Sequence, residues 1–247
     1  MAFQTVFKRF ELKYMLTQDQ KEKVLQAIKP YMELDEYGRT TIRNIYYDTD
    51  TYLLIRRSNE KPEYKEKLRI RSYEQATPES TVFVELKKKY KSVVYKRRIS
   101  LSETEAMEWI AGEHHCRKTT QISEEVDYFL DYYKTLHPAV FLSYEREAYY
   151  TKEKSDFRVT FDDRILCRES DLSLESPPYG TEILPEGMVL MEIKCSGGIP
   201  LWMVKVLSEN SIYKTSFSKY GTAYRMMIYP KLQSTNVNNY KEEAIHA

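Results

Sequence analysis

Four basic residues at alternate positions form the most chemically suggestive feature of the sequence. They are Lys65, Lys67, Arg69 and Arg71, in the segment 64–73. Successive side chains of a β-strand point to opposite faces, so all four cations are expected on one face. Arg grips phosphate oxygens in a planar fork and Lys acts as a mobile point charge. Such a row therefore suits a linear chain of phosphates.

The same alternation of charged with apolar or aromatic residues recurs in the other predicted strands. The further cations on these faces are Arg9, Lys13, Lys87, Lys89, Lys96, Arg98, Arg146, Arg158 and Lys194. The acids on the same faces are fewer, namely Glu11, Glu85, Asp162 and Glu192. One such strand is most often simply solvated, but a solvated face mixes both signs and avoids like charges opposite one another. The agreement among strands favours a basic lumen that binds a polyanion.

The elements that must position these residues are mostly strands. Period-two alternation predicts eight of them, at 5–14, 41–48, 64–73, 81–90, 92–101, 140–150, 157–161 and 189–195. Capping signals and apolar spacing predict helices at 17–29, from 102 onward, and at 124–136, 201–209 and 218–228. Together they predict an antiparallel α+β fold, with the strands closed into a β-barrel and the helices packed outside.

Composition limits the classes of function. Lys plus Arg (38) nearly balances Asp plus Glu (37), so the net charge of +1 provides no general attraction to nucleic acid or an anionic membrane. Any strong anion site must come from sorting charges onto one face. Hydrophobic residues make up 42% and charged residues 30%, which is typical of a globular chain. We therefore predict one domain over residues 1–230 and a polar C-terminal tail over 231–247.

Several common sites are excluded by the motifs that are missing. The three cysteines are odd in number and form no CxxC pair, and glycine is scarce at 7 residues. Neither a disulfide framework, a thiolate metal site, a P-loop nor a dinucleotide-binding loop is indicated. No apolar run approaches the roughly 18 residues of a membrane-spanning helix, and the N-terminus has no signal-peptide pattern. These features predict a soluble, cytoplasmic protein.

A series of short fragments carries a family resemblance over about residues 7–229. In order, they are Phe10-Glu-Leu-Lys-Tyr14, Asn44-Ile-Tyr-Tyr-Asp48, Leu68-Arg-Ile-Arg71, Val84-Glu-Leu-Lys87, Tyr95-Lys-Arg-Arg98, Tyr144-Glu-Arg-Glu-Ala148, Phe157-Arg-Val-Thr-Phe-Asp162, Met191-Glu-Ile-Lys194 and Ser216-Phe-Ser-Lys-Tyr220. Their number and order make the sequence resemble the VTC domain, the catalytic domain of the vacuolar transporter chaperone complex, within the triphosphate tunnel superfamily.

The resemblance implies an eight-stranded antiparallel β-barrel tunnel and a polyphosphate polymerase that transfers the ATP γ-phosphate to a growing chain. It implies catalytic roles for Lys13, Arg69, Arg71, Arg146, Arg158 and Lys219. Further phosphate contacts are expected from Arg9, Lys87, Lys96, Arg98, Lys194, Tyr144 and Ser218. Glu192 is expected to hold Mn²⁺ or Mg²⁺. The implied partners are ATP and polyphosphate, with no nucleic acid; a link to a membrane would need a separate membrane-bound subunit.

Two alternatives remain open at this point. Triphosphate-hydrolysing members of the superfamily begin with Glu-x-Glu-x-Lys, whereas this chain has Arg9, Glu11 and Lys13 at those places. The replacement weakens the hydrolase interpretation. A non-catalytic module that binds polyphosphate or nucleotide is the second alternative, although a pure binder would not need Glu192. We also expect that Arg69 or Arg71 can be changed to Ala with loss of phosphate binding but not of stability, because like-charge crowding is relieved.

Overall fold

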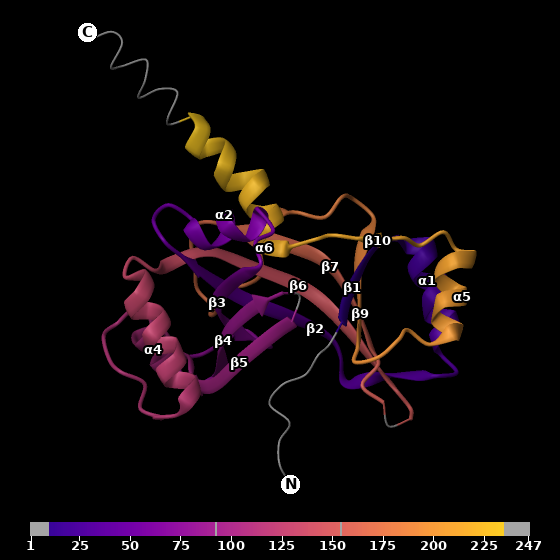
Figure 1. Ribbon diagram of the computed structural model, residues 1–247, viewed down its shortest axis with the longest axis horizontal. Helices are drawn as coiled ribbons and strands as arrows, with labels where there is room; N and C mark the ends of the chain where they lie inside the picture. The colour runs from indigo at the N-terminus through magenta and orange to yellow at the C-terminus, as the bar shows by residue number, and fades with distance from the viewer. Residues whose placement is uncertain (1–9, 92, 154, 235–247) are drawn as a thin grey trace.

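The alternating segments form ten strands of one antiparallel sheet in the computed structural model, which describes residues 10–91, 93–153 and 155–234 (Figure 1). The strands are β1 (Phe10–Thr17), β2 (Met32–Asp48), β3 (Tyr64–Ser72), β4 (Thr81–Tyr90), β5 (Val93–Ser102), β6 (His137–Thr151), β7 (Arg158–Arg168), β8 (Thr181–Glu182), β9 (Met188–Cys195) and β10 (Lys214–Thr215). Each of the eight predicted strands overlaps one of these strands; residues 5–9 and 92 of the predictions are outside the described part, and residues 73 and 157 lie just beyond the observed strands.

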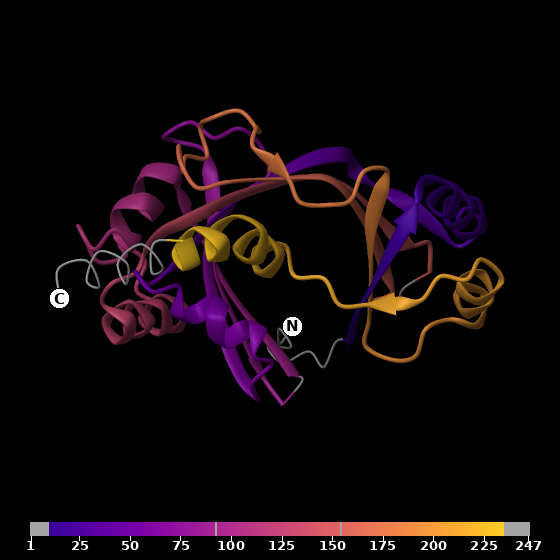
Figure 2. The ribbon, with the colours of Figure 1, turned by 90° about the horizontal axis from the view of Figure 1, so that it is seen from above.

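The sheet is not closed, so the predicted eight-stranded barrel is wrong in both strand number and closure. The order of strands is β10-β1-β9-β7-β6-β2-β3-β4-β5, and β8 pairs with β7. Closure would need β5 to pair with the free edge of β1. In the described residues, β10 pairs with that edge at Lys13 and Tyr14, and β5 pairs with neither β1 nor β10. The sheet nevertheless curves strongly, so that β3–β5 form one limb and β1 with β9 form the other (Figure 2).

The helices are α1 (Gln18–Ile28), α2 (Leu53–Asn59), α3 (Glu103–Ile110), α4 (Gln121–Tyr133), α5 (Leu201–Glu209) and α6 (Lys219–Ala223), followed by the π-helix η1 (Tyr224–Ile228). The capping signals are confirmed: Thr17 and Gln20 form a capping box at α1, as Ser102 and Glu105 do at α3. Helical backbone continues to residue 234, so the first residues of the predicted tail are helical; 235–247 lie outside the described part. In the portion of the chain described, no helix is suited to crossing a bilayer.

Apolar strand faces lie under the helices, and this arrangement leaves the charged faces on the other side. Trp109 of α3 and Phe129 of α4 join the core cluster of β3–β5. Val24 of α1 and Met203 of α5 join the core of β1, β7 and β9. In Figure 2 these two helix pairs lie at opposite ends of the molecule. We call the side of the sheet turned away from α1, α3, α4 and α5 the inner face.

Candidate anion-binding site

One group of charged side chains surrounds Glu85 on the inner face of β3–β5. We call it the Glu85 cluster, and it comprises Glu85, Arg69, Arg71, Lys96 and Arg98. Arg69 donates two hydrogen bonds to Glu85 Oε2, at 2.9 and 2.7 Å. Lys96 Nζ lies 2.7 Å and Arg98 Nε 3.0 Å from Glu85 Oε1, and Arg71 Nε lies 3.9 Å from Oε2. One carboxylate therefore serves four cations.

Strand register explains why these residues meet. Glu85 lies directly opposite Arg69 on β3 and Arg98 on β5, so one carboxylate lies between two arginines on neighbouring strands. Glu85 is 1% exposed. Burial alone would raise its pKa, but Arg69, Arg71 and Lys96 hold the pKa well below the ordinary glutamate value. Burial lowers the pKa of Lys96 to about 7, despite the opposing influence of Glu85.

A second group of charged side chains lies on β1, β6, β7, β9 and α6. We call it the Asp162–Glu192 cluster, and it comprises Asp162, Glu192, Lys13, Arg146, Lys194 and Lys219. Arg146 grips Asp162 with two hydrogen bonds, at 2.6 and 2.7 Å, and Lys219 Nζ lies 2.5 Å from Asp162 Oδ2. Asp162 is fully buried. Burial would raise its pKa, yet Arg146 and Lys219 lower it, so the group stays ionised.

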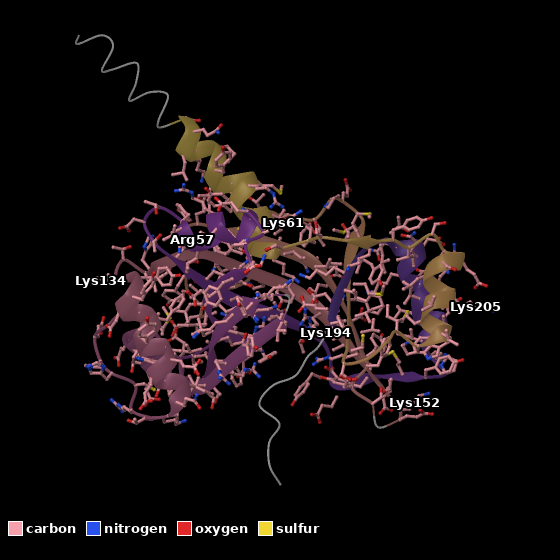
Figure 3. All side chains as sticks on the ribbon, viewed as in Figure 1. Arg57, Lys61, Lys134, Lys152, Lys194 and Lys205 are labelled. Carbon is pink, nitrogen blue, oxygen red and sulfur yellow. The ribbon has the colours of Figure 1, made fainter. Side chains whose placement is uncertain are left out.

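Glu192 is held by the same cluster, but more loosely. Its carboxylate oxygens lie 3.2 Å from Lys194, 3.4 Å from Lys13, 3.7 Å from Lys219 and 3.9 Å from Arg146. Burial opposes ionisation of Glu192, but these four cations set its pKa well below the ordinary value. Figure 3 places Lys194 near the middle of the sheet, whereas Lys205 lies on the outer helix α5. Glu192 is therefore an ionised carboxylate whose ion pairs are longer than those of Asp162.

Tyr144 of β6 connects the two clusters. Its hydroxyl accepts a hydrogen bond from Arg71 at 3.1 Å, and its ring lies 5.1 Å from the Arg146 guanidinium and 4.4 Å from Lys219 Nζ. Burial would raise the pKa of Tyr144, but Arg71, Arg146 and Lys219 lower it below the ordinary tyrosine value. Arg71 also donates to Asn44 Oδ1 at 2.9 Å. Arg71→Ala would leave the Tyr144 hydroxyl and Asn44 Oδ1 without this donor. We therefore expect this variant to lose stability, in contrast to the prediction from the sequence.

Phe217 and Ser218, just before α6, bridge the two limbs through hydrogen bonds. Lys13 of β1 donates to the Phe217 carbonyl at 2.7 Å, and Lys67 of β3 donates to Ser218 Oγ at 3.3 Å. Ser218 is the N-cap of α6 and accepts the Gly221 N–H. The limbs also meet directly, because Lys87 of β4 lies 3.4 Å from Glu11 of β1. The inner face thus brings both clusters together although the sheet remains open.

The remaining predicted residues have distinct positions. Arg158 lies at the margin, opposite Lys194, with its guanidinium 4.4 Å from the Tyr150 ring. Its Nε is buried without a hydrogen-bond partner in the described part of the chain. Burial lowers its pKa. Arg9 lies outside the described residues. The structure thus groups Lys13, Arg69, Arg71, Lys87, Lys96, Arg98, Tyr144, Arg146, Lys194, Ser218, Lys219 and Glu192 on the inner face.

Two features of the site were not predicted as functional. Glu85 and Asp162 were counted as acids on the strand faces, but their role as shared counter-ions depends on register between strands. Tyr220, next to Lys219, donates to the buried Asp48 at 2.9 Å. Asp48 also accepts the backbone N–H groups of Leu54 and Ile55 at the start of α2. This connection fixes α6 against β2 and so positions Lys219.

The side chains fit a divalent ion that binds together with phosphate. Among the described residues, no three His, Cys, Asp or Glu side chains gather into a metal site. Mg²⁺, however, is usually held by one or two carboxylates plus substrate phosphates. Glu192 and Glu11 both lie beside Lys13, at 3.4 and 3.5 Å from its ammonium. Neither carboxylate has an ion pair shorter than 3.2 Å, so both fit as protein ligands, and Glu192 is the one that the family resemblance indicates.

The chain belongs to the VTC domain family, since the family's sequence profile matches residues 8–228. No curated protein matches it. The fold is similar to a candidate adenylate cyclase of Bacillus halodurans, with a TM-score of 0.56 and 15% identity over 91% of this chain and 100% of that one. A Hippeastrum protein described as a candidate adenylyl cyclase with a dominant triphosphatase activity aligns with a TM-score of 0.49 and 13% identity over 87% of this chain and 94% of that one. The first likeness shows the fold.

Proposed function

We propose that this protein is a polyphosphate polymerase that transfers the ATP γ-phosphoryl group to the end of a polyphosphate chain. The single observation that carries the proposal is the convergence of cations from both limbs on the inner face. Four carboxylates, Glu11, Glu85, Asp162 and Glu192, lie among the cations, which outnumber them. A surplus of buried positive charge is costly without an anion, and membership of the VTC domain family makes phosphate the fitting one.

The chemistry needs alignment and positive charge rather than a protein nucleophile. A terminal oxygen of the acceptor chain attacks the γ-phosphorus, a new P–O–P link forms, and the bond to the β-phosphate oxygen breaks. ADP leaves with the electron pair of that bond. Both reactants are anionic, so the cations of the two clusters reduce their repulsion and stabilise the charge spread over the transferring group.

The carboxylates divide into two roles. Glu85 and Asp162 have ion pairs of 2.7 Å or less and hold arginines in fixed orientations. Glu192 has none shorter than 3.2 Å and would hold the divalent ion, Mn²⁺ or Mg²⁺. When bound, this ion would screen phosphate charge as a Lewis acid. Lys13, Lys194 and Lys219 keep Glu192 ionised and oriented for that purpose.

A second candidate function is hydrolysis of triphosphate or polyphosphate. It is favoured by Glu11, which remains at the second carboxylate position of the hydrolase motif and lies 3.5 Å from Lys13. The Lys87 and Lys194 ammonium groups, acting against burial, lower the pKa of Glu11 to about 2, so it is ionised at neutral pH. The first carboxylate of that motif is replaced by Arg9, and for this reason we place transfer to a chain first.

Incubation of the purified protein with ATP, polyphosphate primer and Mn²⁺ or Mg²⁺ tests the proposal. We expect ADP and a lengthened chain on a gel. Orthophosphate released from tripolyphosphate without elongation would instead identify a hydrolase. Tight, salt-sensitive binding without turnover would identify a binding module. Lys205→Met is a suitable control variant because this side chain is 72% exposed on α5.

The wider setting of the protein is part of the same proposal. We propose a cytoplasmic location, where ATP is abundant, and a separate membrane-bound partner as the means of any attachment to a membrane. Nucleic acid is not an expected partner, because the net charge of +1 provides no general attraction to it. Co-purification of a tagged chain with the membrane fraction, before and after a carbonate wash, would test the membrane-bound partner.

A further inference from the structure

A row of lysines continues the inner face beyond the Glu85 cluster. We call Lys65 and Lys67 of β3 with Lys87 and Lys89 of β4 the lysine ladder. In the β3–β4 pairing, Lys65 lies opposite Lys89 and Lys67 lies opposite Lys87. Like charges directly opposite one another destabilise a sheet, so two successive inner-face pairs of this kind need a compensating role.

The ladder has almost no counter-ions. In the described part of the chain, no carboxylate lies within ion-pair distance of Lys65, Lys67 or Lys89, and only Lys87 has one, Glu11 at 3.4 Å. Lys65 donates to the Ser58 carbonyl at 3.2 Å, and Lys67 to Ser218 Oγ at 3.3 Å. These neutral acceptors satisfy hydrogen bonds but do not balance charge.

The electrostatic consequence is strongest at Lys67. Burial, together with the facing cations Lys87, Lys65, Lys13 and Arg69, lowers the pKa of Lys67 to about 7. Burial and the neighbouring ammonium groups, led by that of Lys89, also lower the pKa of Lys65. A bound anion would reverse these shifts, because a negative charge nearby favours the protonated amine.

The position of the ladder indicates what kind of anion it serves. Along β3 the inner-face cations run from Arg71 and Arg69 to Lys67 and Lys65, a row about 20 Å long at the usual rise of a strand. A triphosphate is shorter than this row. The residue type also changes, from arginines fixed by Glu85 to lysines with mobile ammonium groups, which can follow a chain in several registers.

We propose that the lysine ladder is a second anion subsite, which binds the part of a linear phosphate chain that extends beyond the three phosphates held at the two clusters. The inference rests on the proposed function, and it adds that affinity increases with chain length. Lys65 and Lys89, which no motif identified as site residues, are the ladder positions farthest from Glu85.

Calorimetric titration with two probes tests the ladder without requiring turnover. Tripolyphosphate and a long-chain polyphosphate are titrated into the wild type, the double variant Lys65→Met/Lys89→Met and the control Lys88→Met. Lys88 lies on β4 between ladder residues but on the other face, 3.5 Å from Glu125 of α4. We expect the double variant to lose about tenfold in affinity for the long chain, which corresponds to about 1.4 kcal/mol, and less than twofold for tripolyphosphate.

The other outcomes overturn the inference in different ways. If the double variant loses affinity equally for both probes, the ladder belongs to the triphosphate site. If it loses affinity for neither, the ladder does not contact the phosphate chain. A wild type that binds neither probe nor ATP would refute the proposed function as well. A thermal unfolding scan of the double variant monitors the fold, and we expect an unchanged or higher melting temperature because repulsion is relieved.

Discussion

The two clusters of the inner face handle the same excess of positive charge in different ways. Around Glu85 of β4, one carboxylate is shared by Arg69 and Arg71 of β3 and by Lys96 and Arg98 of β5. The other cluster has two carboxylates, of which Asp162 takes the short contacts and Glu192 the long ones. It also receives Lys219 from outside the sheet. The Glu85 cluster therefore holds its arginines in fixed positions, whereas the Asp162–Glu192 cluster contains a carboxylate, Glu192, whose longer ion pairs can rearrange.

Removal of the Glu85 charge should have the largest effect on stability. In Glu85→Gln four cations lose their common counter-ion in a buried site, and we expect a loss of about 3–5 kcal/mol in the free energy of unfolding. Excess polyphosphate should restore part of the loss, because it supplies negative charge at the same place. Urea denaturation with and without polyphosphate measures both effects. Unchanged stability would contradict the view of Glu85 as a shared counter-ion.

Glu192→Gln should affect activity more than stability, in contrast to Glu85→Gln. Its ion pairs are longer, so we expect less destabilisation than in Glu85→Gln, but a fall in metal-dependent turnover on the order of 100-fold. Mn²⁺ affinity in the presence of ATP, followed by electron paramagnetic resonance, should fall in parallel. A variant that keeps full Mn²⁺ affinity would assign the metal to other ligands and remove the distinction between the two clusters.

Two inner-face lysines have a depressed pKa, Lys96 in the Glu85 cluster and Lys67 in the lysine ladder, and this predicts a pH effect of intermediate size. In the free protein the pKa of Lys67 and of Lys96 is about 7, below the ordinary lysine value of 10.5. Between pH 7 and 10.5 the unfolded chain therefore binds more protons, so stability of the free protein should rise with pH over this window.

Polyphosphate affinity should change in the opposite direction. The affinity should fall above pH 7, by up to about tenfold per pH unit for each of Lys67 and Lys96, because the anion binds the protonated form of these lysines. Lys67→Met should flatten the profile. Calorimetry in buffers of different ionisation enthalpy should detect proton uptake on binding at pH 8, and the absence of uptake would show that these lysines are already charged.

The smallest predicted effect is at the margin of the Asp162–Glu192 cluster. Arg158→Lys keeps the charge but removes the fork and the unpartnered Nε, so we expect KM for ATP to rise about threefold with kcat nearly unchanged. Stability should change little, because Arg158 packs on Tyr150 without an ion pair in the described part of the chain. A large fall in kcat would move Arg158 into the reacting centre.

Strand alternation was sufficient to predict the inner face. The period of two in 64–73 and 81–90 determines which side Arg69, Glu85 and Lys87 share, and the structure confirms these assignments. Closure could not be predicted in the same way. It depends on whether β5 meets β1 or β10, which lie at the opposite end of the strand order. Local pattern carries no information about such distant edges.

Long-range pairs were the other part beyond the reach of the sequence. Lys219 was expected to bind phosphate, but its contact with Asp162, 57 residues away, depends on how α6 is held by Asp48 and Tyr220. The short helix α2 was missed because seven residues give too little apolar spacing to recognise. The carboxylate of Asp48 accepts the N–H groups of Leu54 and Ile55, but the N-cap of α2 is Tyr52, which makes no side-chain cap, so no capping signal marked this helix.

The most direct test of the account is an anomalous-scattering map of crystals grown with Mn²⁺ and a non-hydrolysable ATP analogue. We expect one manganese peak at the Glu192 carboxylate, with the analogue's phosphates on the inner face in contact with arginines of both clusters. A peak remote from Glu192, or phosphates bound on the outer surface, would contradict it.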